Sequence, residues 1–194
     1  FVVAGASKRG WTTWLVGAVD ARVRGIIPIV IDVLNMVPSM NHHFDSLGFW
    51  SDAVADYENQ GIFARLDAPE VQNLAHMIDP YFHVDHLTMP KFILNAANDQ
   101  FFMPDSSQFY LSSLKGPTYL RYVPNSGHLM NDFNGIYHML TFYQSVIYEA
   151  PMPQLTFAHP STWNLTFAIE GTPSAITLWQ VETEGHRDFR YRRD

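Results

Sequence analysis

The fold is decided by the stretch FVVAGASKRGWTTWLVGAV, residues 1–19. Its apolar beginning, Phe1–Ala4, predicts a buried strand, and the glycine that follows predicts a tight turn. From Lys8 to Val19 apolar residues recur every three or four positions, which is the stripe of a helix packed on a sheet. The stretch therefore predicts strand, turn and helix, with Ser7 at the turn.

Three more short apolar runs repeat the strand signal along the chain. We predict strands over Ile26–Ile31, Phe92–Ala97 and Tyr119–Val123. Helices are expected after the last two strands, one capped by Asp105 or Ser106 and ending at Gly116-Pro117, the other over Phe133–Tyr148. This alternation predicts an α/β fold with a parallel sheet flanked by helices.

Two segments depart from the alternation. Residues 33–90 are too many for a simple crossover, so we expect a cap-like insertion there. Its aromatic side chains are expected mainly in a core: Phe44, Phe49, Trp50, Tyr57, Tyr81 and Phe82. From Gln154 onward apolar and polar residues alternate around 155–157, 165–169 and 176–178, which predicts a β-rich segment over 151–194 after an α/β portion over 1–150.

The composition is that of a compact globular protein. The chain has 194 residues, 47% hydrophobic and 16% charged, which allows a sizeable core. A net charge of −7 offers no basic stripe for phosphates, so nucleic acid is not an expected partner. The absence of cysteine excludes disulfides and thiolate metal ligands. The longest apolar run, residues 25–33, is too short for the roughly 20 residues of a transmembrane helix.

The turn Gly5-Ala6-Ser7-Lys8-Arg9-Gly10 has the context of a nucleophile elbow, in which a strand-to-helix turn exposes a serine hydroxyl. The usual pattern is G-x-S-x-G, whereas here the second glycine comes one position later. A serine needs a base, itself oriented by an acid. Asp99 follows the third predicted strand and His128 follows the fourth. The order Ser, Asp, His at three strand ends is that of an α/β-hydrolase, and it predicts Ser7, Asp99 and His128 as the catalytic residues.

Each of these residues also has a simpler interpretation. Ser7 alone is more often a helix cap, Asp99 a turn residue and His128 a surface histidine. One hypothesis accounts for all three together, which favours the hydrolase. Asp32, at the end of the second strand, is a rival acid. Because it begins the long insertion, we expect a supporting or structural role for it.

An NAD(P)-dependent oxidoreductase is the weaker alternative. Gly5-x-Ser7-x-x-Gly10 is similar to a dinucleotide-binding turn, and Asp32 could bind a ribose. Ser7 in place of the middle glycine would obstruct the pyrophosphate, however.

Two histidine groups, His42-His43 and His83-Val84-Asp85-His86, lack an evident third metal ligand and are expected in solvated loops. Neither a metal nor a cofactor is expected.

Six longer stretches carry a family resemblance: Gly5–Thr12, Val19–Val23, Ile26–Asp32, Met89–Lys91, Asn95–Ser107 and Leu120–Asn125. They resemble the PhoPQ-activated pathogenicity-related family, whose range includes secreted autocrine proliferation repressors. The resemblance implies an α/β-hydrolase-like fold, the triad Ser7, Asp99 and His128, and the backbone amide of Lys8 as an oxyanion donor. It also implies a secreted or periplasmic location. Because the first residues already read as a strand, we expect an N-terminally truncated domain whose second oxyanion donor lies in a missing loop.

Two classes of function therefore remain. The first is a serine hydrolase that cleaves a small-molecule ester or peptide, in a family linked to virulence or secreted growth regulation. The second is a secreted signalling or binding protein that keeps the fold without turnover. Fold alone does not decide between them, and the sequence leaves the oligomeric state open.

Overall fold

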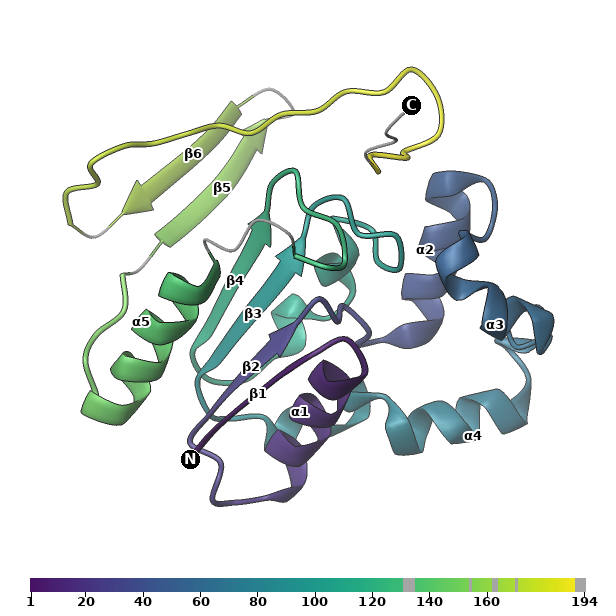
Figure 1. Cartoon of the computed structure of the whole chain (residues 1–194), viewed down its shortest axis with the longest axis horizontal. Coiled ribbons are helices and arrows are strands. Elements are labelled where there is room, and N and C mark those ends of the chain that lie inside the picture. The colour runs from purple at the N-terminus through teal and green to yellow at the C-terminus, as the bar shows by residue number, and fades with distance from the viewer. Residues whose placement is uncertain (131–134, 154, 162–163, 170, 191–194) are drawn as a thin grey trace.

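A four-stranded parallel sheet organises the computed structural model, which describes residues 1–130, 135–153, 155–161, 164–169 and 171–190 (Figure 1). The strands lie side by side in chain order: β1 (Val2–Ala6), β2 (Gly25–Ile29), β3 (Lys91–Ala96) and β4 (Thr118–Val123). The predicted parallel sheet flanked by helices is confirmed. Because all four strands run the same way, the turns that follow them meet at one side of the sheet, called here the carboxyl edge.

Both faces of the sheet are covered, as expected for the central strands β2 and β3, in which nearly every residue is buried. On one face, α1 (Lys8–Val19) places the fully buried Trp14 against Ile26 and Ile93. On the other face, α5 (Gly135–Tyr148) places Phe142 against Ile27 and neighbouring strand residues. The predicted bounds of α1 agree with the structure. The expected start of the last helix at Phe133 lies outside the described residues.

The segment between β2 and β3 is helical. It contains α2 (Met36–Leu47), α3 (Ala55–Asn59) and α4 (Pro69–Ile78), with short 3-10 helices Asp52–Val54, Phe63–Arg65 and Pro80–His86. The two histidine groups expected in solvated loops therefore lie in helices, and His43 is buried because its ring nitrogens contact backbone groups of Phe101 and Ser51.

The expectation that the aromatic residues of this segment belong mainly to a core was wrong. Phe44, Phe49, Tyr57 and Phe82 are each exposed by about 40%. Phe44 packs against Trp50 and Tyr57 packs against Phe63, so these rings form a cluster at the surface of the segment. Trp50 stacks on Phe63 with ring centroids 3.9 Å apart. Trp50 and Phe63 also line a surface hollow of about 500 Å³.

The α-helix expected from Asp105 or Ser106 to Gly116 does not form. Two 3-10 helices, Ser106–Phe109 and Leu111–Ser113, take its place. Tyr110 separates them with a backbone φ of −147°, which no α-helix accommodates. Its side chain is 1% exposed, because it turns inward beneath the carboxyl edge. Burial of one tyrosine therefore outweighs the local helical pattern.

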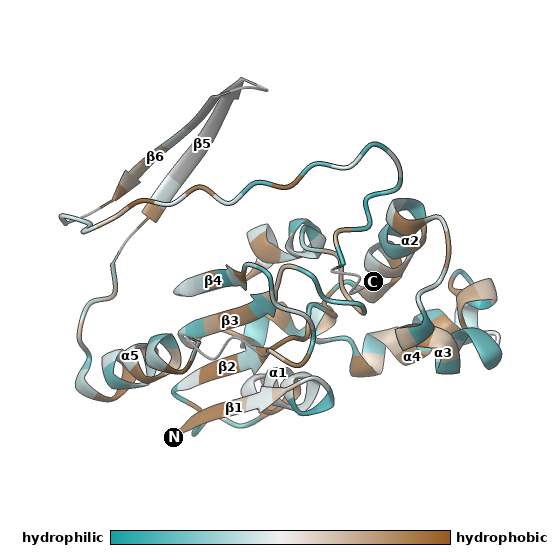
Figure 2. Cartoon of the chain, turned by 45° about the horizontal axis from the view of Figure 1, so that its top comes forward, coloured by the Kyte–Doolittle hydropathy of each residue, from teal (hydrophilic) through white to brown (hydrophobic). Residues whose placement is uncertain are grey.

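The C-terminal part begins with an antiparallel hairpin of β5 (Leu155–Ser161) and β6 (Asn164–Ile169). The hairpin stands apart from the four-stranded sheet, and an extended stretch leads from it back across the molecule (Figures 1 and 2). The third strand expected at Ile176–Leu178 is not formed, since both side chains are more than 60% exposed and have no adjoining strand in the described residues. No helix within the described residues is long and apolar enough to cross a membrane.

Candidate active site

Ser7 occupies a strained turn between β1 and α1. Its backbone has φ 54° and ψ −126°, a region that residues other than glycine rarely adopt. The turn is held from both sides, because the Ser7 amide donates to the carbonyl of Ile29 at 2.9 Å and its carbonyl accepts from the Trp11 amide at 3.1 Å. Although Ser7 is the residue before the helix, its hydroxyl makes no capping hydrogen bond. The hydroxyl is therefore directed to another partner.

Two glycines explain why the turn departs from the usual spacing. A Cβ on Gly10 would lie 2.4 Å from Cγ2 of Ile31, so only glycine lets α1 approach the chain beyond β2 this closely. A Cβ on Gly5 would lie 2.4 Å from the carbonyl oxygen of Arg9. The Arg9 side chain points to solvent and needs no such space. The close packing thus falls at the third residue after the serine instead of the second.

His128 contacts both of the other predicted catalytic residues. Its Nε2 lies 2.9 Å from Oγ of Ser7, and its Nδ1 lies 2.9 Å from Oδ2 of Asp99. The side chains of His128 and Asp99 are only 11% and 2% exposed. With a proton on Nδ1, His128 donates to the carboxylate and Nε2 accepts the serine proton, so the imidazole can accept a proton from Ser7.

The loop after β3 fixes the position of Asp99. Oδ1 of Asp99 accepts a hydrogen bond from the Phe101 amide at 2.8 Å. This bond stabilises the turn after β3, while the other oxygen contacts the histidine. The Phe101 ring packs against the His128 ring with centroids 4.3 Å apart. The carboxamide oxygen of Gln100 accepts from the His128 amide at 3.3 Å. The acid and the imidazole are therefore held by the same loop.

Lys8 is the first residue of α1, directly after Ser7. Amides in the first turn of a helix have no partner within the helix and point toward its positive end. The Lys8 amide thus lies at the N-terminal end of α1, next in sequence to Ser7.

Asp32 lies apart from the Ser7, His128 and Asp99 contacts. Its carboxylate is fully buried and accepts from the phenols of Tyr110 and Tyr122, the second at 2.5 Å. Burial raises the pKa of Asp32 to about 6, and the two phenols oppose that rise. This closed arrangement leaves Asp32 unavailable to a ribose. Sequence reasoning missed both tyrosines, because their partner is 78 and 90 positions away and no local pattern marks them.

Backbone strain gathers at the carboxyl edge. Val30 follows β2 with φ 45°, which ends the strand two residues before the predicted Ile31. Asn125 follows β4 with φ 53°. Together with Ser7, these residues place positive φ angles after three of the four strands. Such outliers collect where a chain must present side chains in an unusual direction.

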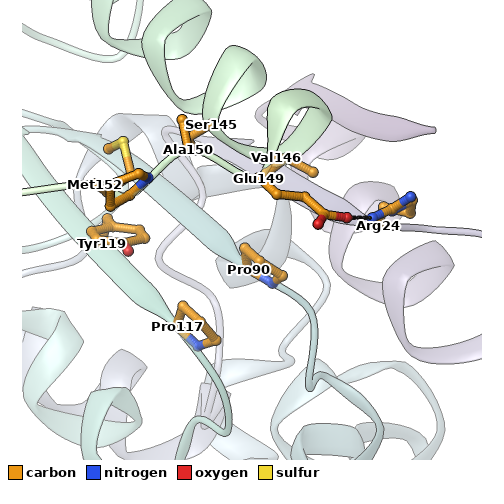
Figure 3. Close-up of a pocket in the computed structure, with 10 residues that line it drawn as sticks. Arg24, Pro90, Pro117, Tyr119, Ser145, Val146, Glu149, Ala150 and Met152 are labelled. Atoms are coloured by element: carbon orange, nitrogen blue, oxygen red, sulfur yellow. Dashed lines mark hydrogen bonds and ion pairs between the residues drawn. The ribbon is translucent and has the colours of Figure 1, made fainter.

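A cavity of about 520 Å³ lies at the opposite edge of the sheet (Figure 3). Arg24, Pro90 and Pro117, which precede β2, β3 and β4, line it, and Arg24 pairs with Glu149 at 2.9 Å. This cavity is therefore remote from Ser7. Within the described residues, no group of three or more His, Asp or Glu side chains is arranged to hold a metal ion.

The sheet, its flanking helices and the strand-end turns define the chain as an α/β-hydrolase fold. An acetyl xylan esterase from Paenibacillus sp. R4 superposes with a TM-score of 0.57 at 18% identity, over 73% of this chain and 44% of the esterase. A puromycin hydrolase superposes with a TM-score of 0.55 at 18% identity, over 76% of this chain and 22% of the hydrolase. The chain belongs to the PhoPQ-activated pathogenicity-related protein family, whose model matches residues 1–190.

The chain is also similar to autocrine proliferation repressor protein A of Dictyostelium discoideum. The two are 40% identical over an alignment of 210 positions, which covers 98% of this chain and 41% of the relative. The chain thus spans less than half the length of the relative. The family resemblance noted in the sequence is confirmed.

Proposed function

We propose that this chain carries the catalytic residues of a serine hydrolase that cleaves an ester or peptide bond. One observation carries the proposal: a single imidazole, His128, lies 2.9 Å from both a serine hydroxyl and a buried carboxylate. The strained backbone of Ser7 supports it, because a serine that only capped a helix would not need a positive φ.

The reaction follows from these contacts. Oγ of Ser7 attacks the carbonyl carbon of the substrate, while Nε2 of His128 takes the hydroxyl proton. The negative charge that forms on the carbonyl oxygen is stabilised by the amide of Lys8. When the intermediate collapses, the bond to the leaving alcohol or amine breaks and His128 returns the proton to it. Water then releases the acyl group from Ser7 by the same steps.

Asp99 orients the imidazole and stabilises its positive charge. The acid does not itself take the proton in this mechanism. Its side chain is nearly excluded from water, so its interaction with a protonated His128 is stronger than at the surface. The Phe101 amide keeps one oxygen of Asp99 fixed and leaves the other for Nδ1.

We propose the following division of the chain. Residues 1–150 are the catalytic portion, residues 33–90 are a cap-like insertion, and residues 151–194 are a β-rich segment. The helices between β2 and β3 support a cap, since α2 packs beside the loop that carries Asp99. The separate β5–β6 hairpin supports a distinct C-terminal segment.

We propose a small-molecule ester or peptide as substrate and a secreted or periplasmic location. The substrate proposal is supported by the chemistry of the Ser7 site and by similarity in fold to an esterase and a hydrolase. The word autocrine in the name of the Dictyostelium relative supports secretion, and its proliferation repressor function supports a link to growth regulation. The family name supports a link to virulence.

The same relative favours a second candidate function, a secreted signalling or binding protein without turnover. A fluorophosphonate probe distinguishes the two, because it forms a covalent bond only with an activated serine. With the protein at its natural length, we expect one adduct, located at Ser7 by peptide mass spectrometry. Ser7→Ala should remove the adduct, while Ser145→Ala, on the outer helix α5, should keep it.

Ester hydrolysis gives the second readout. Ser7→Ala is expected to lower kcat by about 10⁶-fold, as in related triads, with an unchanged urea unfolding midpoint. A wild-type protein that takes no label at Ser7 and hydrolyses no ester would favour the signalling function instead.

A further inference from the structure

The chain returns to the carboxyl edge near its C-terminal end. The segment His186–Arg190, here called the C-terminal strap, lies against α2 (Figure 1). The Arg187 amide donates to the Ser46 carbonyl at 2.7 Å. The His186 ring occupies the space that a side chain at Gly48 would take, 2.4 Å from an ideal Cβ. The strap is therefore fitted to the C-terminal end of α2.

The strap also contacts the loop after β3, Asn98–Asp105. The Asn98 carboxamide donates to the backbone carbonyl of Phe189. Nη1 of Arg187 lies 2.7 Å from Oδ2 of Asp105. These two contacts involve both ends of the loop, and Asn98 is the residue immediately before Asp99.

The same loop also contacts the helical segment between β2 and β3 directly. Nδ1 of His43 lies 3.1 Å from the Phe101 carbonyl, and the Ser51 hydroxyl donates to the Gln100 carbonyl at 2.6 Å. Nε2 of His42 lies 2.7 Å from Oδ1 of Asp105. Asp105 thus joins α2 to the strap through its two oxygens.

The electrostatics of Asp105 agree with this linking role. Partial burial raises the pKa of its carboxyl, but hydrogen bonds from His42 and Arg187 outweigh burial, so the pKa lies below its ordinary value. Asp105 is therefore ionised at neutral pH. Arg187 is half exposed, and loss of this one ion pair should not unfold the chain.

We propose that the C-terminal strap positions the catalytic acid: it clamps the Asn98–Asp105 loop onto α2, with Arg187 as the main positioning residue for Asp99. The inference rests on the proposed hydrolase function and adds that the strap fixes the position of Asp99 relative to His128. The strap acts through the loop and touches no reacting atom. A displacement of about 1 Å in such a constellation can cost about 100-fold in rate, so a weak surface contact can have a large effect on turnover.

The test compares Arg187→Ala with Arg24→Ala in the protein at its natural length. Arg24 is a matched control, because it makes a similar exposed, long-range ion pair with Glu149 at the opposite edge of the sheet. Ester hydrolysis and amide hydrogen exchange of residues 98–105 are measured for each. For Arg187→Ala we expect kcat to fall about tenfold or more, KM to stay within about twofold, and exchange in the loop to rise. Arg24→Ala should change none of these.

Two further variants test whether the contacts of the strap with the loop account for the loss. Asn98→Ala, which removes the other contact, should reproduce the loss in kcat, and Arg187→Lys should restore part of it by keeping the charge beside Asp105. A loss that appears in KM alone would mean that the strap binds substrate, and the positioning role would be wrong. Active wild type with Arg187→Ala equal to Arg24→Ala overturns this inference alone. A wild type that neither hydrolyses ester nor takes label at Ser7 overturns the proposed function as well.

Discussion

The phenol of Tyr122 on β4 donates a hydrogen bond to Oδ2 of Asp32 at 2.5 Å, across ninety positions of the sequence. With Tyr110 on the other oxygen, it encloses a carboxylate that has no exposed surface. The pair joins the carboxyl ends of β2 and β4, on either side of the strand that leads to Asp99.

The first prediction concerns the pH dependence of stability. Burial raises the folded pKa of Asp32 to about 6 from an ordinary 3.8. Between these values the folded state binds more protons than the unfolded state, so the free energy of unfolding falls as pH rises from about 4 to 6. At about 1.4 kcal/mol per pKa unit, the fall is on the order of 3 kcal/mol. Asp32→Asn should lack this component in urea denaturation from pH 4 to 7.5. A difference between the two proteins that is constant across that range would contradict the prediction.

The second prediction removes one donor. Tyr122→Phe leaves one oxygen of a buried carboxylate without its phenol, and a hydrogen bond to a charged group contributes about 1.5–3 kcal/mol. We expect a loss of that size in the free energy of unfolding at pH 7.5, measured with urea. Tyr143→Phe, on the exposed side of α5, is the control and should change little. Equal effects would show that the bond to Asp32 contributes nothing.

The third prediction separates the two carboxylates. Asp99→Asn replaces an acceptor with an amide that favours the wrong histidine tautomer, so kcat for an ester should fall about 10⁴-fold, as in a serine protease. Asp32→Asn should cost far less, because Asp32 bonds to tyrosines instead of to His128. Steady-state kinetics at one pH decides between them. The opposite ranking would assign the acid to Asp32.

The fourth prediction concerns the close approach of α1 to the chain beyond β2. Gly10→Ala forces a Cβ to within 2.4 Å of Ile31, and such overpacking costs about 1–3 kcal/mol. Gly17→Ala in the same helix meets its nearest atom, Cγ2 of Ile26, at 3.1 Å and should be milder. Urea denaturation of both variants measures the difference. A Gly17 variant less stable than the Gly10 variant would argue against the role given to Gly10.

The sequence predicts those helices and strands whose apolar pattern and flanking turns lie close together along the chain. The helix Lys8–Val19 is one of these, because its apolar stripe and its flanking turn are both local. The three strand-end residues could also be predicted, since parallel strands bring their carboxyl ends to one edge. Ser7, Asp99 and His128 meet there for that reason.

What the sequence did not predict depends on distant partners. Tyr110 breaks an expected helix because a buried carboxylate 78 positions away attracts it. His43 is buried on α2 because Phe101, 58 positions away, offers a carbonyl. Lys91 is fully buried at the start of β3, where its ammonium donates to the carbonyls of Leu87 and Met89, both at 2.8 Å. No pattern of neighbouring residues carries such information.

The positive φ of Ser7 has a consequence for the history of the chain. A side chain held in that backbone region costs on the order of 1–3 kcal/mol, and glycine would avoid most of the cost. Selection for stability alone would therefore replace the serine at position 7 by glycine. A lineage that had abandoned the hydroxyl would be expected to drift in that direction. The proposed catalytic role of the Ser7 hydroxyl would account for a serine at this cost to stability.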